Sequence, residues 1–110
     1  DIRGLVMVNS MRGEVELVLD GRPHRARLTL GALVELETEL DEAGLTGLAR
    51  RLEEGRFSSR DILSVLVAGL RGAGWSGNAA DLMSVQIEGG PLEAARAAAR
   101  LLTLAFRGAA

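Results

Sequence analysis

The chain has no cysteine and few aromatic residues. Its 110 residues include one tryptophan, two phenylalanines and no tyrosine, an aromatic share of 3%. Without cysteine, the sequence offers no disulfide, no thiol nucleophile and no cysteine-ligated zinc site. Hydrophobic residues nevertheless make up 47% of the chain, a normal share for a globular protein. The core is therefore expected to consist of Leu, Val, Ile and Ala side chains.

An excess of positive charge is also missing. Lysine is absent, and 13 arginines stand against 15 acidic residues, which gives a net charge of −2 and a pI near 5.4. Nucleic-acid binding needs clustered positive charge to neutralise phosphates, and this balance does not supply it. No apolar run approaches the roughly 20 residues of a membrane-spanning helix. The sequence therefore predicts a soluble, cytoplasmic protein that binds neither nucleic acid nor a membrane.

No group of residues has the pattern of a catalytic or metal site. His24 is the single histidine, and a general base or a metal site needs partners that it lacks. Glu35 and Glu39 are four residues apart on an expected helix, which is typical of a solvated face. The glycine-rich segment 69–74 follows a helix instead of a strand and lacks the Gly-Lys-Ser/Thr ending of a phosphate loop. We expect no enzyme activity, no cofactor and no metal.

The folded part of the chain is expected to begin near residue 12. Asp1 is not an initiator, whereas Met7 and Met11 both could be, so residues 1–11 are interpreted as a leader outside the fold. Residues 12–110 are long enough for one core and are expected to form a single globular domain.

The first expected element is a β-hairpin over residues 13–28. Residues 14–19 largely alternate between polar and apolar side chains, and Asp20-Gly21 is a strong two-residue turn signal. Closing the hairpin there predicts charged pairs on one face and mostly apolar pairs on the other, namely Glu14–Arg27, Glu16–Arg25, Val15–Ala26 and Leu17–His24.

Residues 29–107 are expected to be helical. The expected helices begin at caps or at proline, and the first three end near glycine. They run from Thr29 to Gly44, from Thr46 to Gly55, from Ser58 to the Gly72/Gly74 region, from Asn78 to near Val85, and from Gly90-Pro91 to residue 107. The apolar side of the first is expected to comprise Leu30, Leu33, Val34, Leu36 and Leu40. The predicted fold class is α+β, mainly α, with the hairpin packed on a small bundle of about four to five helices.

The last expected helix is apolar around most of its circumference. Such a helix is either buried centrally or part of a partner interface. Trp75, the only tryptophan, is expected to close the edge of the core or, if exposed, to anchor a contact. The candidate partner-binding residues are Trp75, Leu101, Leu102, Leu104 and Phe106.

Several segments in this order resemble a small protein of the tail cluster of phage-derived gene transfer agents. The segments are 13–17 and 20–23, then 28–37, 56–62, 69–74 and 87–92, and the resemblance covers about residues 12–106. That family has been labelled both a tail tube protein and a tail-assembly chaperone. The chaperone role implies binding to the helical tape-measure protein until tube subunits assemble around it.

Three hypotheses for the function follow. The first is a tail-assembly chaperone whose partner is the tape-measure protein or another tail protein. The chaperone hypothesis suits this chain better than the tube hypothesis, because a tube is lined by long strands and the sequence predicts one short hairpin. The second is a structural tail tube component, which requires self-association of the chain into homo-oligomers. The third is a generic helical adaptor or regulatory domain, and the acidic pI argues against a DNA-binding version of it.

Overall fold

The computed structural model describes residue 9 and residues 12–107. The expected leader over residues 1–11 lies outside the described residues, apart from Asn9. The described chain forms a two-stranded antiparallel hairpin followed by five helices, which confirms the α+β, mainly α class. The strands are β1 (Glu14–Leu19) and β2 (Arg22–Arg27), and the helices are α1 (Leu30–Glu37), α2 (Gly44–Glu53), α3 (Ser59–Gly72), α4 (Ala79–Ser84) and α5 (Gly90–Phe106).

The hairpin closes at the predicted turn and in the predicted register. Asp20 and Gly21 have φ angles of 50° and 78°, as a tight two-residue hairpin turn requires. Glu16 lies opposite Arg25, and Val15 lies opposite Ala26. The apolar face of β1 is buried, while the opposite face carries an ion pair in which Arg25 Nη1 lies 3.8 Å from Glu14 Oε2.

A segment of the loop before α5 pairs with the free edge of β1. The Asp20 amide donates to the Gln86 carbonyl (2.8 Å), and the Glu88 amide donates to the Val18 carbonyl (2.9 Å). The Asp20 carboxylate also accepts a hydrogen bond from the Gln86 amide at 2.9 Å. These bonds fix the loop between α4 and α5 beside the hairpin.

Local capping signals correctly predicted where three helices begin. Thr29 caps α1, and complete capping boxes are present at Ser58/Asp61 and Asn78/Asp81. Two boundaries differ from the prediction. First, α1 ends at Glu37 and does not continue to Gly44: at its end the Thr38 hydroxyl donates to the Glu35 carbonyl (2.6 Å), and turns follow, a side-chain bond that competes with helix continuation.

The second helix begins two residues before the predicted cap. α2 starts at Gly44, with Ala43 at the N-cap position and no side-chain cap. Thr46 therefore lies inside its first turn. Gly44 has a φ of 62°, a conformation that glycine adopts without the steric cost other residues pay.

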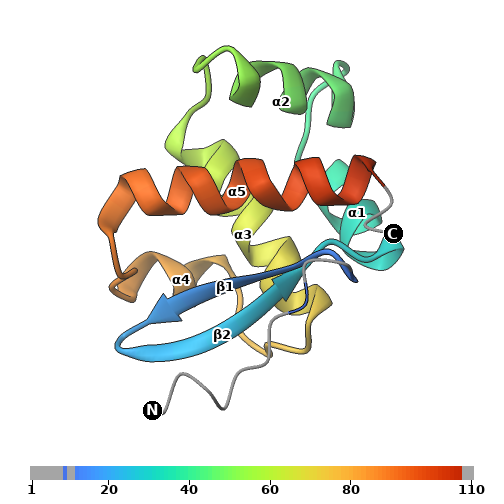
Figure 1. Ribbon diagram of the computed structural model, residues 1–110. Coiled ribbons are helices and arrows are strands. Elements are labelled where there is room, and N and C mark those ends of the chain that lie inside the picture. The colour runs from blue at the N-terminus through green and yellow to red at the C-terminus, as the bar shows by residue number, and fades with distance from the viewer. Residues whose placement is uncertain (1–8, 10–11, 108–110) are drawn as a thin grey trace.

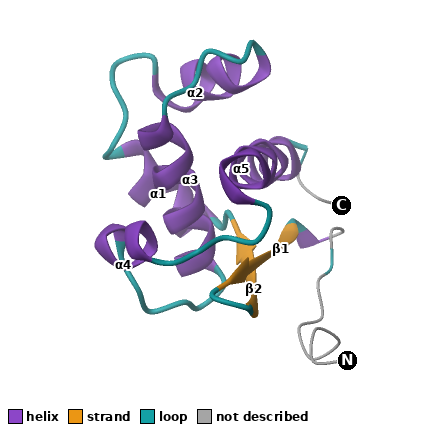
Figure 2. Ribbon diagram, turned by 90° about the vertical axis from the view of Figure 1, so that its left-hand side faces the viewer, coloured by secondary structure: helices purple, strands orange, loops and turns teal. Residues whose placement is uncertain are grey.

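The core lies where α3 and α5 meet the hairpin (Figure 1). Gly69 of α3 allows this close approach, since a Cβ atom there would lie 2.9 Å from Leu101 Cδ1 and 3.3 Å from Ala26 Cβ. Figure 2 shows α3 between α4 and α5. As the composition predicted, the fully buried large side chains are aliphatic: Leu17, Leu36, Leu48, Leu66, Leu70, Leu101 and Val65.

Candidate functional site

The five residues predicted to bind a partner do not form one surface. Leu101 and Leu102 are 0% and 3% exposed, in the core between α5 and the rest of the fold. In this conformation a partner does not reach these two leucines, so their partner-binding role stays a prediction that their burial does not favour. The sequence pattern of α5 allowed either a central, buried helix or a partner interface. The burial of these leucines favours the central position.

The three remaining candidates differ in exposure. Leu104 and Trp75 are partly buried and pack against the core. The Trp75 ring lies against Gly77, where a Cβ atom would collide with it. Phe106 is 54% exposed at the end of α5. Of the five, Phe106 is thus the one side chain that presents a largely free apolar surface.

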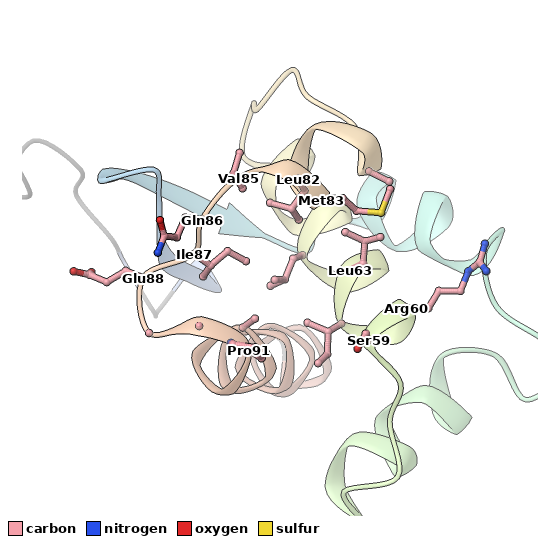
Figure 3. A pocket seen from close by; sticks show the side chains of 16 residues that line it. Ser59, Arg60, Leu63, Leu82, Met83, Val85, Gln86, Ile87, Glu88 and Pro91 are labelled. Carbon is pink, nitrogen blue, oxygen red and sulfur yellow. The ribbon is translucent and has the colours of Figure 1, made fainter.

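A groove of about 1180 Å³ lies elsewhere, among α3, α4 and the start of α5 (Figure 3). Its floor consists of Leu66, Leu82 and Ala94, each at most 5% exposed. Because these side chains are held by core packing, the floor exists before any partner binds. The remaining apolar lining comes from α3, α4 and the loop before α5: Ile62, Leu63, Ala79, Met83, Val85, Ile87 and Pro91.

The pairing of residues 86–88 with β1 holds one wall of the groove in place. The backbone groups of Gln86 and Glu88 form hydrogen bonds with the hairpin, whereas Val85 and Ile87 line the groove. Gly89 then turns the chain with a φ of 88°, so that Pro91 at the start of α5 joins the same lining.

Charged side chains lie at the two ends of the groove. Figure 3 shows Arg60 at the end formed by α3 and Glu88 at the opposite end, with Leu63, Leu82 and Ile87 between them. Met83 on the rim is 69% exposed. A flexible, polarisable methionine adapts to partners of different shape.

The chemistry of the groove is that of a binding surface. Small-molecule sites usually have volumes of roughly 300–1,000 Å³ with a few converging polar groups, whereas this groove is larger and carries its charges at the ends. Within the described ranges, no group of three or more His, Cys, Asp or Glu residues is arranged to hold a metal ion. His24 lies on β2, where its Nδ1 is 2.8 Å from the Arg22 carbonyl oxygen. The lining of the groove therefore suits apolar side chains.

Sequence reasoning did not find this groove. Its lining comes from three separate stretches, residues 59–66, 79–91 and 94, and no local pattern links them. The available signal was the apolar pair Val85 and Ile87, at and just beyond the end of the helix expected from Asn78 to near Val85.

None of the helices in the described part of the chain is both long enough and apolar enough to cross a membrane.

A comparison with protein families identifies a family described as "Phage tail tube protein, GTA-gp10", whose model matches residues 12–108. No curated protein and no solved structure matches the chain. The family match spans nearly the whole sequence, including the hairpin, all the described helices and every residue of the groove. The chain therefore belongs to the phage tail tube family of gene transfer agents.

Proposed function

We propose that this protein is a tail-assembly chaperone that holds an apolar helical segment of the tape-measure protein in the groove between α3, α4 and α5. The observation that carries the proposal is the preformed apolar floor of Leu66, Leu82 and Ala94 beneath an exposed rim. An amphipathic helix inserts its apolar face into a groove of this kind. The chaperone would keep such helices from aggregating until the tail is assembled.

The short strands also support a chaperone more than a tube subunit. A tube lined by a closed sheet needs strands that pair continuously around the ring. β1 and β2 have six residues each, and one edge of β1 is already occupied by the loop at Ile87.

A structural tail tube subunit is the second candidate, favoured by the description of the family. The two functions differ in the stability of the assembly. A tube subunit forms tubes that persist on dilution and do not need the tape-measure protein. A chaperone instead forms a soluble complex with a tape-measure fragment.

The decisive variant is Met83→Glu. Met83 is 69% exposed, so the variant should unfold at the same temperature as the wild type. A carboxylate on the rim would be desolvated by an apolar guest. We expect Met83→Glu to weaken binding of a labelled helical tape-measure fragment at least tenfold, or about 1.4 kcal/mol, measured by fluorescence anisotropy.

Leu92→Glu is the matched control. Leu92 is 63% exposed and does not line the groove, so this variant should bind the fragment within about twofold of the wild type. Equal losses in the two variants, or stable tubes of the protein alone in electron micrographs, would refute the proposed function.

A further inference from the structure

Helix α1 has a second apolar face that the chain itself does not cover. Its inward face buries Ala32 and Leu36, while Leu30 and Val34 are 79% and 57% exposed. Leu30 and Val34 are four residues apart and therefore lie side by side on the helix surface. Glu37 follows three residues after Val34, on the same exposed face.

The groove has the complementary properties. It offers an aliphatic floor to two aliphatic side chains, and Arg60 lies at its α3 end. Within the described part of the chain, neither Glu37 nor Arg60 has a side-chain hydrogen bond or an ion pair. The protein thus carries an apolar ridge beside an unpaired acid and an apolar groove beside an unpaired base.

The ridge and the groove of one molecule do not meet. In Figure 1, α1 and α4 lie on either side of α3, and no residue of α1 lines the groove. A ridge that fills this groove must therefore come from another molecule. Such a contact joins two different surfaces, and repeating it closes a ring or extends an open chain.

We infer that the protein self-associates head to tail, with α1 of a second copy in the groove. Leu30 and Val34 enter the apolar lining, and Glu37 faces Arg60. This association needs no outside partner and does not rest on the proposed chaperone function.

The contact is small and reversible. α1 has eight residues, which span about 12 Å. An interface of this length falls below the roughly 1,200 Å² of standard stable interfaces. Association is therefore expected to depend on protein concentration.

Sedimentation velocity over a range of concentrations tests the inference with two variants. Val34→Glu places a charge on the ridge, and Met83→Glu places one in the groove. Both side chains are more than half exposed, so both variants should fold. Each alone is expected to remain monomeric at concentrations where the wild type forms larger species. Leu92→Glu should associate like the wild type.

Mixing the two variants gives the sharpest result. Val34→Glu keeps an intact groove and Met83→Glu keeps an intact α1, so an equimolar mixture should form dimers and nothing larger. A wild type that stays monomeric throughout the range, variants that associate like the wild type, or a mixture that stays monomeric would each overturn the inference.

The ionic contact tests the orientation of α1. Glu37→Arg and Arg60→Glu should each weaken association at least fivefold, and the double variant should recover most of it. A double variant weaker than both single variants would overturn the pairing of Glu37 with Arg60.

Binding of the tape-measure fragment separates this inference from the proposed function. If Val34→Glu still self-associates while Met83→Glu loses the fragment, the inference fails and the chaperone function stands. If the mixed variants form dimers and no variant binds the fragment, the inference stands and the chaperone function fails.

Discussion

Two helical glycines show how the surroundings of a residue decide the effect of one methyl group. At Gly72, a Cβ atom would overlap the carbonyl oxygen of Arg27 and lie 3.2 Å from Ala32 Cβ. At Gly31, the nearest atom is Thr29 Oγ1 at 3.9 Å. The backbone of the hairpin cannot move away as a flexible side chain could, so only the first position penalises a larger residue.

We expect the two alanine substitutions to change stability in opposite directions. Gly72→Ala should lower the free energy of unfolding by about 1–3 kcal/mol, as overpacking does. Gly31→Ala should raise it by up to about 1 kcal/mol, because alanine restricts the unfolded chain and favours the helix. Urea denaturation of both variants measures the difference. Equal changes of the same sign would contradict this account.

At the scale of elements, an ion pair attaches α2 to the start of α3. Arg51 Nη2 donates to Asp61 Oδ1 at 3.0 Å, and Arg51 Nε donates to Asp61 Oδ2 at 3.2 Å. Asp61 also belongs to the capping box, where its carboxylate accepts from the Ser58 amide. One carboxylate thus holds both the first turn of α3 and the neighbouring helix.

The pKa of Asp61 lies below its ordinary value of 3.8. Partial burial acts to raise the pKa of Asp61, but the hydrogen bond from Arg51, the bonds with Ser58 and the charge of Arg51 together outweigh it. Since the pKa is lower in the fold, the ionised group stabilises the native state above pH 3.8. That stabilisation is lost as the pH falls through the pKa of the folded state.

Arg51→Gln isolates the contribution of the ion pair. Above pH 3.8 the variant should be less stable than the wild type by about 0.5–1 kcal/mol. This difference should shrink as the pH falls and Asp61 is protonated. Denaturant unfolding at a series of pH values measures it. Asp81 is the matching capping carboxylate without an ion pair. Like Asp61 it belongs to a capping box, here at the start of α4, but it forms no ion pair with an arginine in the described part of the chain. A difference that does not depend on pH would contradict the proposed role of Asp61.

At the scale of the whole molecule, one groove serves both proposals. The tape-measure segment and α1 of a second copy would occupy the same lining of α3, α4 and the loop before α5. Two ligands of one site compete, so each lowers the apparent affinity of the other. Self-association would then cover the groove until a partner displaces it.

An excess of tape-measure fragment is therefore expected to dissociate the self-associated protein into complexes that each contain one copy. Val34→Glu, which lacks the competing α1 face, should bind the fragment more tightly than the wild type at high protein concentration. Sedimentation velocity with a labelled fragment follows both species. A fragment that binds without dissociating the assemblies would place the two contacts on separate surfaces.

Features that depend on interactions between neighbouring residues were predictable from the sequence. Asp20-Gly21 dictated the turn and the strand register, and the Ser58/Asp61 and Asn78/Asp81 boxes dictated where α3 and α4 begin. These interactions join residues at most a few positions apart, so their physical cause is visible in the local sequence. The family resemblance was detectable for the same reason, since its motifs are mostly turns, caps and glycines.

Which apolar residues are buried and which stay exposed depends on the packing of distant segments. Periodicity placed Leu30 and Val34 on the apolar side of their helix, yet the fold leaves both exposed. The pattern around Leu101 allowed either burial or a contact surface, and the fold buries Leu101. Likewise, the pairing of Gln86 and Glu88 with β1 joins segments more than 60 residues apart, and the groove depends on that pairing. Burial is a property of the neighbours that a side chain meets in space, and distant segments supply those neighbours only once the chain has folded.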